Sequence, residues 1–129
     1  MVADGGNHRI QVLRYSDGQH LRTIGEEGAG NGQLKRPLGV ALYTLDGAGH
    51  LVVVEHYNHR VQVLNYGDGS HVRTIGSEGS GIGQLTHPSG VVIDGDGRMI
   101  VADTGNNRVQ VLHLRTPSTP LSFPPSLRE

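Results

Sequence analysis

The chain has 129 residues, a formal net charge of -1 and no cysteine. The balanced charge gives no electrostatic argument for nucleic acid, an anionic membrane or an acidic substrate as a partner, and without cysteine there are no disulfides or thiolate metal sites. No apolar run approaches the ~18 residues of a membrane span and no leader follows Met1, so we expect a cytoplasmic protein. With only 4% aromatic residues, valine, leucine and isoleucine must fill any core.

One short segment occurs three times in the chain. The copies are VADGGNHRIQVL at 2–13, VVVEHYNHRVQVL at 52–64 and VADTGNNRVQVL at 101–112. A period of about 50 residues is typical of solenoids, propellers and arrays. The sequence therefore predicts repeated structural units, about 2.5 of which fit into the chain.

The first unit, 1–36, begins inside its second strand, so we expect it to lack a first strand. It ends in a glycine-rich connector, EEGAGNGQLKRP at 26–37, which recurs as SEGSGIGQLTHP at 77–88. Glycine permits a tight approach of the backbone in such a loop. The final proline cannot donate to a strand ladder, which places it just before the next strand.

The second unit, 37–87, is predicted to be complete. Asp-Gly pairs between its apolar runs are strong hairpin signals, because glycine adopts the positive φ of a tight turn. The YTL stretch at 43–45 looks like an insertion. Successive hairpins predict an antiparallel four-stranded meander with strands at 39–43, 50–55, 60–66 and 71–76.

The third unit, 88–114, supplies three strands and then stops. Residues 115–129 hold four of the six prolines and show no strand period, so we expect a Pro/Ser-rich disordered tail. In the second unit, residues 51–54 form a continuous apolar run, which indicates a sheet covered on both faces. We therefore predict an all-β, partial β-propeller of four-stranded antiparallel blades, with one complete blade between two incomplete ones.

The order of Pro, Gly-Val, Asp-Gly-x-Gly and V-A-D-x-G-N-x-R-V-Q-V-L resembles the NHL repeat, a blade unit of mostly six-bladed propellers. The resemblance covers 2–114, and Glu55 departs from it where Asp4 and Asp103 follow it. It implies an open arc unless other chains complete it, and therefore a fragment of a longer protein or a subunit that needs partners. A homo-oligomer is one way to cover the open blade faces.

Each copy of the repeated segment places a carboxylate five residues before an arginine: Asp4 and Arg9, Glu55 and Arg60, Asp103 and Arg108. We expect these turn pairs to be structural, since charge-assisted hydrogen bonds would hold the turn. As surface pairs they would contribute only about 0–1 kcal/mol each. The alternative is a ring of arginines that contacts a ligand.

Blade topology predicts one interaction face, because the turn between the second and third strands and the connector emerge at the same end. The candidate residues on it are Lys35, Arg36, His56, Tyr57, Asn58, His59, Asn106 and Asn107. The Asp-Gly hairpins should occupy the opposite end. RNA phosphates could be neutralised at the first end, but glutamates share it and stacking aromatics are few.

No catalytic residue, metal ligand or cofactor is predicted. His8 and His59 are repeat equivalents, so their recurrence follows from duplication and does not indicate a zinc site, which needs three or four converging ligands. The Asp-Gly-Asp-Gly stretch at 94–97 lacks the remaining ligands of a calcium loop and is predicted to be a hairpin turn.

These observations predict a non-catalytic NHL-type propeller module that mediates protein–protein interaction. By resemblance, its place would be as a recognition part of a ubiquitin-ligase system. Two alternatives stay open: an RNA-binding propeller, and a propeller enzyme of the amidating-lyase or lactonase-like hydrolase type.

Overall fold

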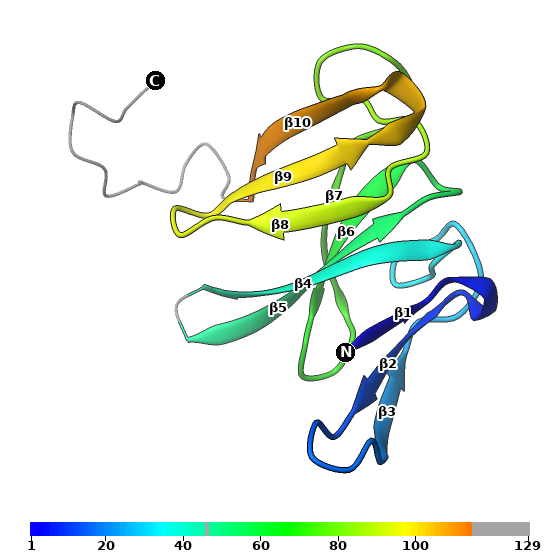
Figure 1. The fold of residues 1–129 in the computed structure, drawn as a ribbon, viewed down its shortest axis with the longest axis vertical. Helices are drawn as coiled ribbons and strands as arrows, with labels where there is room; N and C mark the ends of the chain where they lie inside the picture. The colour runs from blue at the N-terminus through cyan, green and yellow to red at the C-terminus, as the bar shows by residue number, and fades with distance from the viewer. Residues whose placement is uncertain (46, 115–129) are drawn as a thin grey trace.

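The computed structural model describes residues 1–45 and 47–114. The predicted tail at 115–129 lies outside the described residues. Within them, ten strands form three antiparallel sheets of three, four and three strands in chain order (Figure 1). None of the helices in this part of the chain is long and apolar enough to cross a membrane.

The second sheet contains the four strands that the hairpin signals predicted. They are β4 (Pro37–Leu45), β5 (Ala48–Glu55), β6 (Arg60–Asn65) and β7 (His71–Ile75), hydrogen-bonded in that order. The first hairpin is tighter than predicted, because Thr44 pairs with Gly49 and Leu45 with Ala48. Residues 43–45, interpreted as an insertion, continue the ladder and make β4 longer than β8 (Gly90–Ile93), the equivalent strand of the third sheet.

The outer sheets have three strands each. The first contains β1 (Val2–Asp4), β2 (Arg9–Leu13) and β3 (His20–Ile24), and the third contains β8 (Gly90–Ile93), β9 (Arg98–Asp103) and β10 (Arg108–His113). Short 3₁₀ turns, η1 (Gly5–Asn7) and η2 (Thr104–Asn106), join β1 to β2 and β9 to β10. Each turn ends in a residue with left-handed backbone, His8 with φ 56° and Asn107 with φ 55°, a conformation in which His and Asn are enriched.

The second sheet is buried on both faces. Successive side chains of a strand point to opposite faces, so β5 sends Leu51 and Val53 toward the first sheet and Val52 and Val54 toward the third. All four are fully buried. The prediction of a sheet covered on both sides is confirmed, and it explains the continuous apolar run.

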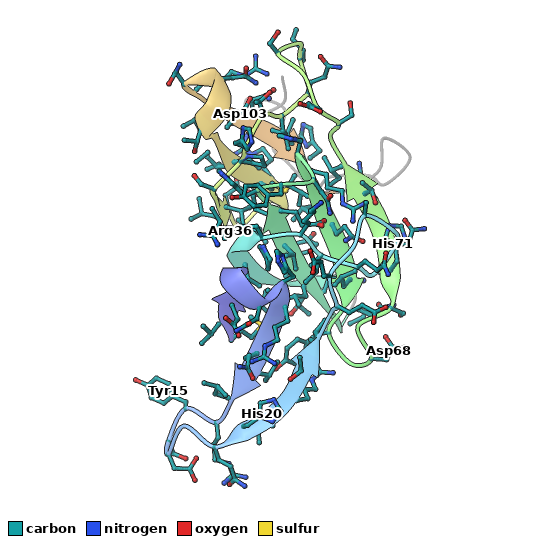
Figure 2. All side chains as sticks on the ribbon, turned by 90° about the vertical axis from the view of Figure 1, so that its right-hand side faces the viewer. Tyr15, His20, Arg36, Asp68, His71 and Asp103 are labelled. Carbon is teal, nitrogen blue, oxygen red and sulfur yellow. The ribbon has the colours of Figure 1, made fainter. Side chains whose placement is uncertain are left out.

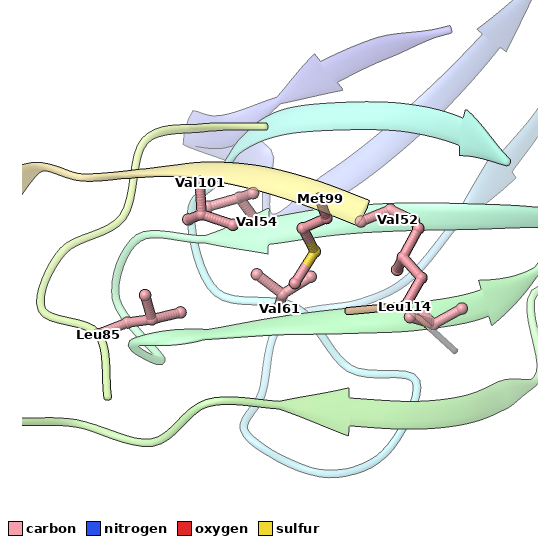
Figure 3. Packing of buried hydrophobic residues seen from close by; sticks show 8 residues of the cluster. Val52, Val54, Val61, Leu85, Met99, Val101 and Leu114 are labelled. Carbon is pink, nitrogen blue, oxygen red and sulfur yellow. The ribbon is translucent and has the colours of Figure 1, made fainter. Parts of the chain in front are cut away.

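Two apolar clusters hold the sheets together. One contains Ile10, Val12, Ile24, Leu34, Leu51, Val53 and Leu64. The other, shown in Figure 3, contains Val52, Val54, Val61, Val63, Leu85, Met99, Val101 and Leu114. Leu34 and Leu85 come from the two connectors and are fully buried, so each connector contributes one side chain to the core beside it.

The three sheets form a partial β-propeller. β4 lies beside both β1 and β8, and the first and third sheets stand at opposite ends of the stack in Figure 1. Each outer sheet keeps apolar side chains in solvent: Val2 and Leu21 are 48% and 52% exposed, and Val92, Val109 and Val111 are 59–64% exposed. The arc therefore ends in two uncovered faces.

Candidate interaction surface

The three carboxylate–arginine turn pairs all form ion pairs. The distances from arginine Nε to a carboxylate oxygen are 2.9 Å for Arg9–Asp4, 2.6 Å for Arg60–Glu55 and 2.7 Å for Arg108–Asp103. The side chains of Glu55 and Asp103 are 0% exposed, whereas that of Asp4 is 25% exposed. The expectation of surface pairs was wrong for Glu55 and Asp103, because other residues cover them.

The cover is the connector that precedes each sheet. At the third sheet, Arg108 donates to the carbonyl oxygens of Ser80 at 2.9 Å, Gly81 at 2.8 Å and Gln84 at 2.9 Å. The Thr86 N–H donates to Asp103 Oδ1 at 2.8 Å. The guanidinium fork is thus occupied by backbone of the same chain.

Hydrogen bonds control the ionisation of Asp103. Burial raises its pKa, but donation from the Thr86 N–H, Asn106, Arg108 and Gln110 outweighs burial and holds the pKa below its ordinary value. The buried carboxylate is therefore kept charged by groups of both the connector and the sheet.

Sequence reasoning missed two glutamines in this arrangement. Gln62 is fully buried; its Nε2 donates to Gln33 O at 2.6 Å and to Glu55 Oε2 at 2.9 Å, while its Oε1 accepts from Gly32 N at 3.0 Å. Gln110 makes the matching bonds to the second connector. A signal was present, since one polar residue recurs between apolar neighbours in every copy of the segment.

The candidate asparagines divide by their contacts. Asn58 Nδ2 donates to Gly28 O at 2.9 Å and to Glu55 Oε1 at 2.7 Å, and Asn106 Nδ2 donates to Gly79 O at 2.8 Å and to Asp103 Oδ2 at 3.0 Å. Both amide groups are engaged with the connector and the carboxylate. Asn107 is exposed at the end of η2.

Two histidines link one unit to the next. His8 Nδ1 accepts from the Arg36 N–H at 2.9 Å, and His59 Nδ1 accepts from the His87 N–H at 3.0 Å. In the neutral ring the proton must therefore sit on Nε2, which faces Glu78 at 3.7 Å in the case of His59. The repeated histidine thus holds the backbone that leads into the following sheet.

Several candidate residues gather around Tyr57 and form what we call the basic–aromatic surface: Lys35, Arg36, His56, Tyr57, His59 and His87. Ring centroids lie 4.8 Å apart for His56 and His87, 4.5 Å for His59 and His87, and 5.3 Å for His56 and Tyr57. The Arg36 guanidinium lies 5.9 Å from the centre of the Tyr57 ring. His87 belongs to the second connector, which sequence reasoning placed at this end of the blades, but it was not among the candidate residues.

Backbone pairing brings these side chains together. The His56 N–H donates to Arg36 O at 3.0 Å and the Tyr57 N–H donates to Lys35 O at 3.2 Å, which lays the β5–β6 turn against the end of the first connector. Figure 2 looks onto this end of the molecule and shows Arg36 beside the turn of the first sheet.

The basic–aromatic surface presents unused polar groups. Tyr57 is 49% exposed and Lys35 is also exposed. Within residues 1–45 and 47–114, the Lys35 ammonium and the Tyr57 hydroxyl have no hydrogen-bond or ion-pair partner. The same part of the chain holds no group of three or more His, Asp or Glu side chains that could bind a metal ion. The surface can therefore offer a cation, a phenol and aromatic faces to a partner.

Stacked antiparallel sheets, of which the second and third are each held by the connector before them, define a repeat protein of the β-propeller class. A family model described as the NHL repeat matches residues 85–112, from the buried leucine of the second connector into β10. The resemblance drawn from the sequence is confirmed, and the repeat is typical of propeller-type modules that mediate protein interactions and are usually non-catalytic. No curated protein matches the chain.

Proposed function

We propose that the chain is a non-catalytic module that binds a protein partner through the basic–aromatic surface. The observation that carries this proposal is the contrast between neighbouring side chains. Asn58 and Arg60 donate to the connector, whereas the Lys35 ammonium and the Tyr57 hydroxyl have no hydrogen-bond or ion-pair partner among the described residues. Tyrosine and arginine are enriched in the binding centres of protein interfaces, and the cations favour a partner segment with carboxylates.

The resemblance to NHL propellers supports a setting for this binding. A recognition part of a ubiquitin-ligase system is the role we propose, with the surface selecting the protein to be modified. This role requires a partner that recognises Tyr57 and Lys35 side chains.

A quantitative affinity-capture experiment tests the proposal. Lys35→Ala/Tyr57→Ala removes one cation and one exposed ring from the surface. Arg14→Ala/Tyr15→Ala is the matched control, since it removes the same two kinds of side chain from the exposed β2–β3 hairpin (Figure 2). We expect specific partners to be lost with the first variant and kept with the control; identical sets of captured proteins for all forms would contradict the proposal.

RNA is a second candidate, favoured by one observation. Four aromatic rings cluster beside Lys35 and Arg36, and bases stack on such rings while phosphates pair with cations. Glu78 at the same end opposes this partner. Fluorescence anisotropy with a single-stranded RNA oligonucleotide tests it: affinity must fall as salt rises, and a flat salt dependence excludes RNA.

We also propose that the uncovered sheet faces associate with one another in a homo-oligomer. Exposed apolar side chains cluster on the outer face of the third sheet, where Val92 and Val111 both neighbour Ile100 across the strands. Contiguous apolar surface of this kind favours association.

A further inference from the structure

The second and third sheets each bind a looped segment of the same chain with four equivalent side chains: a carboxylate, an asparagine, an arginine and a glutamine. At the third sheet this segment is the second connector, and every contact is made to its backbone. Three side chains of the sheet donate to the connector: Asn106 to Gly79 O at 2.8 Å, Arg108 to Ser80 O, Gly81 O and Gln84 O at 2.8–2.9 Å, and Gln110 to Gln84 O at 2.6 Å. In the other direction, Gly83 N donates to Gln110 at 3.1 Å and Thr86 N donates to Asp103 at 2.8 Å.

The second sheet repeats these contacts with the first connector. Asn58 donates to Gly28 O, Arg60 to Ala29 O, Gly30 O and Gln33 O, and Gln62 to Gln33 O, while Gly32 N and Lys35 N donate to Gln62 and Glu55. Two independent segments therefore adopt one bound conformation. The four side chains form a peptide-binding site of defined geometry.

The bound conformation limits which peptides fit. A Cβ at Gly79 would lie 2.2 Å from Gln84 Oε1, and Gly83 has a left-handed φ of 78°. Gln84 Oε1 accepts from Gly81 N at 2.9 Å, and Leu85 is fully buried. Both connectors satisfy these demands with Gly-x-Gly-x-Gly-Gln-Leu.

The first sheet carries the same four side chains without a peptide. Asp4 accepts from Arg9 Nε at 2.9 Å, from Asn7 at 3.1 and 3.2 Å and from Gln11 at 3.5 Å. Within residues 1–45 and 47–114, no acceptor faces the two terminal nitrogens of Arg9. The Asp4 side chain is 25% exposed, against 0% for Glu55 and Asp103, so the site is formed and open.

We propose that Asp4, Asn7, Arg9 and Gln11 form a binding site for a Gly-x-Gly-x-Gly-Gln-Leu segment. Arg9 supplies the fork for three backbone carbonyl oxygens, Gln11 pairs with the backbone before the leucine, and Asp4 accepts the N–H that follows it. The site recognises the backbone conformation of the bound segment, and the glycines and the glutamine of that segment are what allow it to adopt this conformation. The site shares no residue with the basic–aromatic surface, so its test does not depend on the partner of that surface.

An NMR titration of the full chain with a synthetic peptide tests this site. The peptide has the sequence of residues 77–88, SEGSGIGQLTHP, and the chemical shifts of Asp4, Asn7, Arg9 and Gln11 report binding. We expect saturable shifts confined to the first sheet. Arg9→Ala should weaken binding at least about tenfold, because several hydrogen bonds from a charged donor are lost.

The controls separate specific binding from loss of the fold. Arg9→Lys keeps a cation beside Asp4 but removes the fork, and it should also bind weakly, whereas Arg14→Ala on the far hairpin should bind like the parent. A peptide with alanine at the positions of Gly79 and Gly83 should not bind. Absent shifts at millimolar peptide, or equal binding by the alanine peptide, would overturn the proposal.

Discussion

At the scale of single residues, Glu55 has the most demanding environment. It is fully buried and accepts from Arg60, Gln62, Asn58 and the Lys35 N–H at 2.6–3.2 Å. A buried charge is tolerated only when its partners satisfy it. Glu55 thus ties the connector, the turn and β6 to one point.

Neutralising this carboxylate should destabilise the protein. In Glu55→Gln an NH₂ group replaces one carboxylate oxygen and faces groups that are themselves donors, and Arg60 loses its counter-charge. We expect the free energy of unfolding to fall by about 3 kcal/mol, measured by urea unfolding at pH 7. Asp4→Asn is the matched control and should cost less, because the Asp4 side chain is partly exposed; equal losses would contradict the role given to burial.

Acid should destabilise the fold through its aspartates. Hydrogen bonds from Arg9 and Ser70 lower the pKa of Asp4 and Asp68, the Arg98 N–H lowers that of Asp94, and Asp103 is lowered despite burial. Because the folded-state pKa lies below the ordinary 3.8, the unfolded chain takes up protons first as the pH falls. Stability is therefore fully present above that value and is lost as the pH drops through the folded-state pKa values.

Urea unfolding between neutral and strongly acidic pH measures this effect. Asp103→Asn should remove part of the pH dependence below the ordinary aspartate pKa. A free energy of unfolding that stays level or rises on acidification would show that these carboxylates are not stabilised in the folded state.

The three carboxylate–arginine ion pairs could be predicted from the sequence, but the burial of Glu55 and Asp103 could not. Carboxylate and arginine stand close in the chain, so their pairing across the turn could be foreseen. The connector that covers Glu55 lies 20 and more residues upstream, and no local pattern shows that it returns to the same strand. The recurrent Gln11, Gln62 and Gln110 were the available signal that another segment covers the strand, because a polar residue in a buried strand needs hydrogen-bond partners.

At the scale of elements, the connectors behave as part of the core. Leu85 is fully buried in the cluster between the second and third sheets (Figure 3). Leu85→Ala should reduce the free energy of unfolding by about 2–5 kcal/mol through lost packing and a cavity. Hydrogen exchange of β8–β10 should also accelerate, since the third sheet loses a shared contact.

Ile82→Ala in the same connector is the control for this prediction. Ile82 is 100% exposed, so its truncation should change stability by no more than about 0.5 kcal/mol. If the two variants lost equal stability, the leucine would have no special packing role.

The strands were largely predictable, since Asp-Gly turns and alternating side chains are local signals. The β4–β5 hairpin was the exception: the predicted strands were 39–43 and 50–55, but pairing continues to Leu45 and Ala48. Residues such as Tyr43 and Thr44 suit a strand, and the ladder extends as far as the partner allows.

At the scale of the whole molecule, the open face of the third sheet is the surface through which we propose that the chain self-associates. Val109 and Val111 are 64% and 59% exposed, while the equivalent Val61 and Val63 of the second sheet are buried by the next sheet. Val109→Lys/Val111→Lys should reduce self-association without unfolding the chain. Sedimentation velocity across a range of protein concentrations measures it.

Val72→Lys is the control, because Val72 is also exposed, at 45%, but lies on β7. It should leave association unchanged. A parent protein that stays monomeric at every concentration would contradict the proposed homo-oligomer.

The contacts of the connectors also give the molecule a direction of growth. Each connector precedes in the chain the sheet that it binds, and domains form in N- to C-terminal order during synthesis. A loop therefore leaves the ribosome before the arginine of the sheet that binds it. A unit added after β10 would leave earlier units intact, whereas one added before β1 would deliver a loop to Arg9.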